Sequence, residues 1–87
     1  MAPFDSLAES PDTRADAGWE QFLDLGISYS LGRNVPQDLV EAHKWLNIAA
    51  ARGSADARLH RGEIARDMTV AEIAEAQRQA RAWLAVN

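Results

Sequence analysis

Apolar residues follow a helical spacing along most of this chain, and the longest such pattern lies over about residues 11–31. At 100° per residue, its apolar positions cover a very wide arc of a helix surface. Those positions are Trp19, Phe22, Leu23, Leu25, Gly26, Ile27 and Tyr29. An arc this wide has to be buried on more than one side. The pattern therefore predicts a first helix, started by Ser10 and Pro11, that this chain or another covers on both sides.

A second helix is predicted over residues 39–52. Asp38 suits its N-cap, because its short side chain can accept a hydrogen bond from the first turn. The apolar face predicted by the spacing consists of Leu39, Ala42, Trp45, Leu46, Ala49 and Ala50. Gly53 suits the end of this helix, since glycine readily adopts the left-handed conformation that closes a helix.

Two further helices are predicted over residues 55–67 and 70–85. Ser54 can cap the first, and Thr69 with Glu72 forms a capping box at the start of the second. No segment alternates between apolar and polar residues with a period of two. We therefore predict an all-α chain of about four helices.

Two of these helices contain matching segments. Residues 42–46 and residues 80–84 both read A-x-x-W-L, and the two copies begin 38 residues apart. A fixed offset in this range is typical of helical repeats. Repeats of this kind usually hold partners on a surface of stacked helices.

Small and aromatic residues in the first two predicted helices extend this pattern. They are Leu25, Gly26, Tyr29, Gly32, Pro36, Ala42, Trp45, Ala49, Ala50 and Gly53. With these residues the segment resembles the Sel-one-like repeat family, which is related to the tetratricopeptide repeats. The resemblance implies a short α-solenoid of stacked αα-hairpins, with one full repeat over about residues 18–53.

The resemblance is weaker in the second half of the chain. Arg61 stands where the family pattern has an apolar residue, usually leucine, and no aromatic residue corresponds to Tyr29. Because repeat arrays need end units with a more polar outer face, residues 54–87 are expected to form a degenerate repeat that acts as a C-terminal cap. The repeat domain then spans residues 11–87, after a flexible N-terminal arm of residues 1–10.

Three of the repeat positions have a direct physical interpretation. Gly26 removes a side chain where two helices are expected to touch, and Gly32 lets the chain leave the first helix. Trp45 is large enough to fill the space between helices.

Composition and charge limit the possible partners. The chain has 87 residues and no cysteine, which excludes disulfides and thiol nucleophiles. Its net charge of −4 argues against general nucleic-acid binding, which usually shows a basic excess. No stretch approaches the roughly 20 apolar residues that cross a membrane. Since the sequence does not start with a secretory signal, we expect a cytoplasmic protein with no membrane span.

No pattern in the sequence indicates catalysis or metal binding. His43 and His60 are not spaced as a ligand pair on a helix, and both are interpreted as structural or solvated residues. Ser28 and Ser30 lack a neighbouring base and a nucleophile-elbow motif. We therefore predict that the chain is not an enzyme and takes no cofactor, metal or small-molecule substrate.

Arginines gather in the second half of the chain. They are Arg58, Arg61, Arg66, Arg78 and Arg81. One interpretation is a set of surface ion pairs with Glu63, Asp67, Glu72 and Glu75, each worth about 0–1 kcal/mol. The alternative is a basic patch that binds an acidic protein segment or an RNA backbone.

The leading functional hypothesis is a protein–protein interaction module, an adaptor or scaffold that binds a peptide or helix of a partner protein. The over-wide apolar arc places the binding surface on the first helix, at Glu20, Leu23, Asp24, Ile27 and Ser30. One alternative is a small structural subunit of a larger complex or homo-oligomer, because about three repeats are usual for a stable solenoid. A weaker alternative is nucleic-acid association through the C-terminal arginines.

Overall fold

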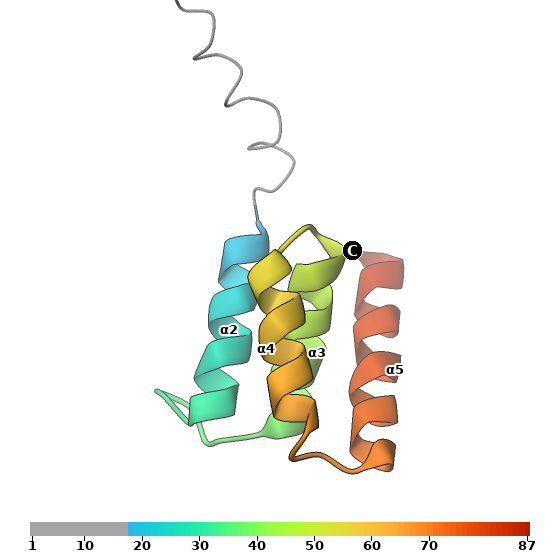
Figure 1. Ribbon diagram of the computed structural model, residues 1–87. Coiled ribbons are helices and arrows are strands. Elements are labelled where there is room, and N and C mark those ends of the chain that lie inside the picture. Colours follow the sequence, from blue (N-terminus) through green and yellow to red (C-terminus); the bar gives the residue numbers. More distant parts are fainter. Residues whose placement is uncertain (1–17) are drawn as a thin grey trace, which may run out of the picture.

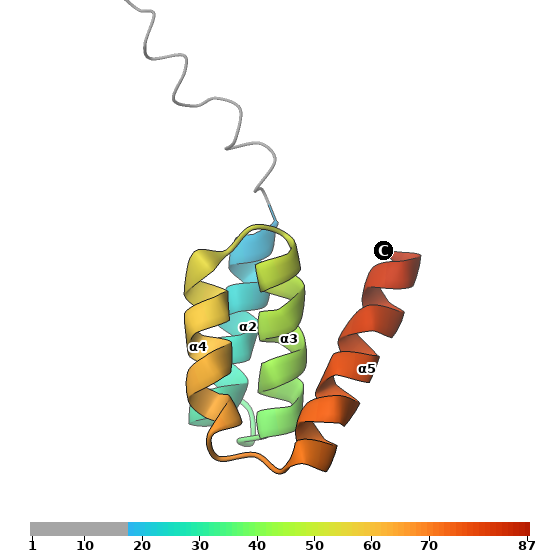
Figure 2. The same cartoon turned by 45° about the vertical axis from the view of Figure 1, so that its right-hand side comes forward.

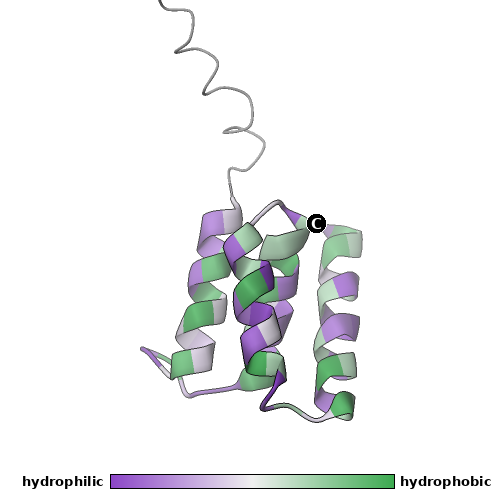
Figure 3. Ribbon diagram, in the orientation of Figure 1, coloured by the Kyte–Doolittle hydropathy of each residue, from purple (hydrophilic) through white to green (hydrophobic). Residues whose placement is uncertain are grey.

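Four helices make up the part of the chain that the computed structural model describes, residues 18–87 (Figure 1). They are α2 (Trp19–Leu31), α3 (Leu39–Ala51), α4 (Ala55–Ala65) and α5 (Val70–Val86). No strand occurs among these residues, so the prediction of an all-α chain with about four helices is confirmed for them. Hydrophobic and hydrophilic residues alternate around the helices, as helical spacing predicts (Figure 3).

Helix α3 is the central element of the fold. It contacts α2, α4 and α5, and α2 also contacts α4. Helices α4 and α5 barely touch, and Figure 2 shows α5 diverging from α4 beyond the turn that joins them. The first hairpin, α2 with α3, is therefore closed, whereas the second hairpin, α4 with α5, is open.

The first helix of the described region begins later than the sequence predicts. Gly18 precedes it with a φ of 106°, a left-handed conformation, so the expectation that the helix passes through this residue is wrong. At the other end, Gly32 has a φ of 71° and its backbone N–H donates to the Ser28 carbonyl, as predicted. Residues 11–17 of the predicted helix and the expected arm of residues 1–10 lie outside the described residues.

The other three helices begin where their capping residues predict. Asp38, Ser54 and Thr69 each accept a hydrogen bond of 3.0 Å from the backbone N–H three residues ahead. Glu72 completes the capping box by accepting a hydrogen bond of 2.8 Å from the backbone N–H of Thr69. Gly53, just after α3, has the expected positive φ, at 111°. Helices α3, α4 and α5 end within two residues of their predicted positions.

The core is built mainly from small side chains. Leu46 and Ile48 on α3 are its largest fully buried apolar side chains. Alanines from α3, α4 and α5 fill most of the remaining space: Ala42, Ala49, Ala50, Ala57, Ala76 and Ala80. Small residues at a helix contact let the two backbones approach closely. The alanine-rich face predicted for the second helix is therefore confirmed as its packing face.

Three aromatic rings hold α5 against the first hairpin. The ring centroids of Phe22 on α2 and Trp45 on α3 stack 5.7 Å apart. Trp83 on α5 meets both rings edge-on, with its centroid 5.0 Å from Phe22 and 5.8 Å from Trp45. The guanidinium of Arg52 lies 5.9 Å from the Phe22 centroid and 5.5 Å from the Trp83 centroid. The two A-x-x-W-L segments thus touch through their matching tryptophans.

Helices α2 and α3 approach most closely at Gly26. A Cβ atom added to this residue would lie 2.5 Å from Leu46 Cδ2 and 3.3 Å from the carbonyl oxygen of Ala42. The Leu46 side chain is only 1% exposed, so the surrounding core leaves it little room to move away. The expectation that Gly26 removes a side chain where two helices touch is confirmed.

We predict that Gly26→Ala lowers the free energy of unfolding by about 1–3 kcal/mol, because the added methyl group forces Leu46 or α2 to shift. Urea denaturation followed by circular dichroism measures this change.

Gly62→Ala is the matched control, since Gly62 also lies within a helix but a Cβ atom added there meets nothing within 4 Å. This variant is expected to gain about 0.5–1 kcal/mol of stability from reduced backbone entropy in the unfolded chain. Equal stabilisation by both substitutions would contradict the close contact at Gly26.

Candidate functional site

A half-open groove of about 340 Å³ lies between α2 and α4. The end of α2, the segment around the start of α3 and the C-terminal half of α4 form its walls. The lining residues are Ile27, Ser30, Leu31, Gln37, Leu39, His60, Glu63, Ile64 and Asp67. This volume is near the lower end of the range of roughly 300–1,000 Å³ that ligand sites occupy.

The groove combines an apolar lining with polar groups that are partly used within the chain. Its apolar side chains are Ile27, Leu31, Leu39 and Ile64. The Ser30 hydroxyl donates a hydrogen bond of 2.8 Å to the carbonyl of Ile27. The Gln37 side-chain amide donates one of 2.9 Å to the carbonyl of Ser30. The bond from Gln37 joins the loop wall of the groove to the last turn of α2, whereas the bond from Ser30 stays within that helix.

The ionisable groups that line the groove are two carboxylates and one histidine. Glu63 and Asp67 are exposed, and His60 Nδ1 lies 3.5 Å from a Glu63 carboxylate oxygen. None of the described residues that line the groove is lysine or arginine. The groove therefore offers a ligand apolar contacts beside negative charge.

The structure separates the residues that the sequence predicts as a binding surface. Ile27 and Ser30 line the groove. Glu20 and Asp24 are exposed on α2, about two turns and one turn before the groove residue Ile27, at helical spacing from it. Leu23 is half-buried, packs against the core and does not line the groove.

The wall that α4 contributes is absent from the sequence-based prediction. His60, Glu63, Ile64 and Asp67 supply it, and the sequence analysis treats the charged members of this set only as solvated residues or ion-pair partners. Their spacing in the sequence does predict that they share one face of a helix, because residues three and four positions apart are neighbours on a helix surface. What the sequence does not show is that this face of α4 lies beside α2.

A partly buried polar network links α3 to α4 outside the groove. Arg61 Nη1 donates a hydrogen bond of 2.8 Å to Asn47 Oδ1, and the Asn47 side-chain amide lies 2.9 Å from His43 Nδ1. Because Asn47 Oδ1 accepts from Arg61, its amide group donates to His43, whose Nδ1 must then be unprotonated. Arg61 thus has a polar partner on α3.

His43 is therefore the satisfied structural histidine that the sequence analysis favours. It is 2% exposed. Burial lowers the pKa of its imidazole below the usual 6.5, and the nearby positive charge of Arg61 lowers this pKa further. Neutral His43 and the hydrogen bond from Asn47 support one another.

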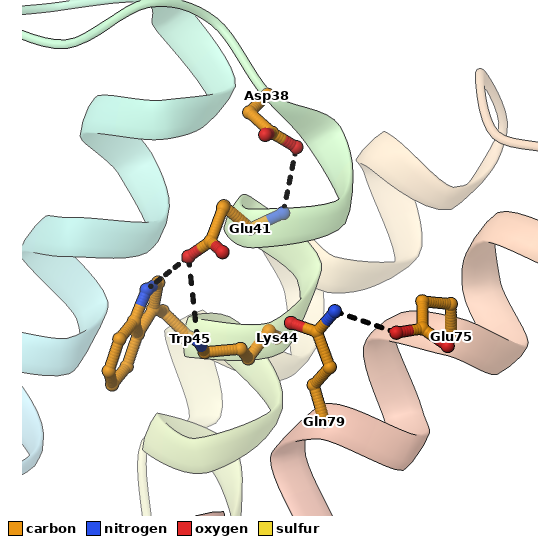
Figure 4. A network of polar contacts seen from close by, with 6 residues as sticks. All are labelled: Asp38, Glu41, Lys44, Trp45, Glu75 and Gln79. Carbon is orange, nitrogen blue, oxygen red and sulfur yellow. Dashed lines mark hydrogen bonds and ion pairs between the residues drawn. The ribbon is translucent and has the colours of Figure 1, made fainter.

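A second polar cluster lies on the side of α3 that faces α5. Figure 4 shows the Glu41 carboxylate between Trp45, whose indole N–H donates to it at 3.0 Å, and Lys44, whose amine lies 3.5 Å away. On α5, hydrogen bonds from Arg78 and then from Gln79 lower the pKa of the Glu75 carboxyl to about 2. These contacts orient side chains around the aromatic cluster.

The arginines only partly follow the ion-pair interpretation. Within residues 18–87, Arg78 pairs with Glu75 at 2.6 Å, whereas Glu63 pairs with His60. Arg58, Arg66 and Arg81 are exposed.

Residues 18–87 also lack two other kinds of site. No group of three or more His, Asp or Glu side chains there could hold a metal ion. None of the four helices is long and apolar enough to cross a membrane.

No protein-family model, curated protein or solved structure matches the chain. The groove between α2 and α4 is therefore interpreted from its own geometry and chemistry.

We predict that the free energy of unfolding falls as the pH drops below about 6.5, the ordinary pKa of histidine. The folded state holds His43 with a lowered pKa, so the unfolded chain binds more protons in this range. Urea denaturation at pH 7.5 and pH 5.5 measures the difference.

His43→Gln should flatten this dependence, because glutamine does not titrate. His60→Gln is the control, since His60 is partly exposed and does not belong to the network of His43, Asn47 and Arg61. This variant should retain the fall in the free energy of unfolding at low pH. A slope that survives in His43→Gln would rule out His43 as its source.

Proposed function

We propose that this chain is a protein-interaction module in which the groove between α2 and α4 binds a segment of a partner protein. The observation that carries the proposal is the groove itself, with four apolar side chains in its lining and an exposed leucine, Leu31, at 64% exposure. Exposed apolar surface of this kind is commonly covered by a partner.

We further propose that the chain is a short helical repeat of the Sel-one-like type, with α2 and α3 as the full repeat and α4 and α5 as its cap. The close contact at Gly26 and the positive φ of Gly32 support this interpretation, because both are repeat positions with a clear physical role. Edge-on packing of Trp45 against Trp83 supports a relation between the two halves. The open hairpin of α4 and α5 is in keeping with a terminal unit.

Binding is favoured over catalysis by the way the groove uses its polar groups. The Ser30 hydroxyl donates to a backbone carbonyl, and His60 lies beside Glu63 rather than beside a serine. A nucleophile needs a base within hydrogen-bonding reach. No described pair in the groove has that arrangement.

Peptides selected against the chain from a random peptide library provide the test. We predict that Leu31→Ala weakens the affinity of the selected peptides about tenfold, or about 1.4 kcal/mol, as loss of a leucine contact allows. Isothermal titration calorimetry measures the dissociation constants.

Leu59→Ala is the matched control, because Leu59 lies on α4 with 63% exposure but does not line the groove. It should leave the affinities unchanged. The proposal fails if no selected peptide distinguishes Leu31→Ala from Leu59→Ala.

A further inference from the structure

One face of α2 carries both apolar and acidic side chains in a single stripe. Glu20, Asp24, Ile27 and Leu31 are spaced by four, three and four residues, so they lie along the same side of the helix. Ile27 and Leu31 line the groove, whereas Glu20 and Asp24 are exposed closer to the N-terminal end. The acidic residues thus continue the groove along α2.

Helix α4 and the turn that follows it carry a corresponding stripe. Asp56, His60, Glu63 and Asp67 have the same spacing, and the last three line the groove. Helices α2 and α4 lie side by side and run in the same direction (Figure 1). The two stripes therefore border one continuous surface, which we call the acidic face.

The acidic face has no matching positive charge in its two stripes. Its exposed carboxylates are Glu20, Asp24, Asp56, Glu63 and Asp67. The arginines of α4 stand at other positions: Arg61 donates to Asn47 on α3, and Arg58 and Arg66 are exposed outside the stripe. Charge is thus segregated around α4, with acids toward α2 and arginines away from it.

We propose that the acidic face binds a cationic amphipathic segment of a partner protein, with apolar side chains in the groove and lysine or arginine side chains beside the carboxylates. This inference rests on the proposed function and adds the chemistry of the partner. Charge complementarity requires the partner segment to be cationic, because like charges facing one another across an interface oppose binding.

Charge complementarity also selects among the segments that could bind the acidic face. Residues 1–17 of the chain itself contain four acids, Asp5, Glu9, Asp12 and Asp16, against a single arginine, so their charge has the same sign as that of the acidic face. From Glu20 to Leu31 the stripe extends over about 16 Å, at 1.5 Å per residue. A partner helix of about three turns has the matching length.

Two synthetic peptides of about 12 residues test the proposal. Both carry leucine at every third or fourth position; one has lysine at the positions between, and the other has glutamate. We expect the lysine peptide to bind at least about tenfold more tightly at low salt. Its affinity should fall as NaCl rises from about 50 to 300 mM, because salt screens exposed charges.

The double variant Glu63→Lys, Asp67→Lys should remove most of the preference for the lysine peptide, because it leaves three of the five exposed carboxylates and adds two positive charges beside them. A control places the same added positive charge on exposed positions of α5, by Ala71→Lys, Ala74→Lys, Ala82→Lys and Ala85→Lys. That control should keep the wild-type order, because the charge lies away from the acidic face. Circular dichroism confirms that each variant is helical before binding is measured.

The possible failures are distinguishable. If the two peptides bind the wild-type chain equally, or if the α5 control also loses the preference for the lysine peptide, the proposed partner chemistry is overturned. The groove remains a binding site as long as Leu31→Ala weakens binding. If neither peptide binds and Leu31→Ala affects no selected peptide, both this inference and the proposed function are overturned.

Discussion

The contact of Gly26 with Leu46 and the Ala42 backbone is the constraint on which the arrangement of the helices depends. A side chain as small as a methyl group cannot be placed at position 26 without displacing a buried leucine. Helix α2 can therefore lie directly on α3. Because α4 packs against α3 as well, this close approach also brings α2 beside α4. The groove and the acidic face lie between α2 and α4 because both of these helices pack against α3.

The opposite side of α3 has a different construction. There the helices pack through aromatic rings rather than through a glycine contact such as that at Gly26. Phe22 and Trp45 stack, and Trp83 meets both rings edge-on. Helix α5 contacts α3 extensively but barely touches α4. The exposed carboxylates of the acidic face lie on the other side, along α2 and α4. Helix α3 thus separates a proposed binding side from a structural side.

Much of the fold could be predicted because its signals are local. The caps at Asp38, Ser54 and Thr69 depend on side chains and backbone groups three residues apart, which the sequence displays directly. The small residue at Gly26 was predicted from its position in a repeat pattern. The start of α2 was not, because a left-handed Gly18 interrupts a segment whose spacing alone favours a continuous helix.

The candidate site was only half predictable, since it depends on which helices become neighbours. Ile27 and Ser30 follow from the over-wide apolar arc of α2, but the facing wall on α4 requires knowing that the two helices lie side by side. Arg61 illustrates the same limit. Its place in an apolar face is explained by Asn47, which lies on another helix and is distant in sequence.

The central claim is that α2 rests on α3 through the contact between Gly26 and Leu46. The most direct measurement is a nuclear Overhauser spectrum of the isotopically labelled chain, which reports pairs of protons within about 5 Å. The Gly26 Hα protons are predicted to show strong cross-peaks to the Leu46 δ-methyl groups, because an added Cβ would lie 2.5 Å from Cδ2. Leu46 methyl groups with cross-peaks to other core residues but none to Gly26 would contradict the account.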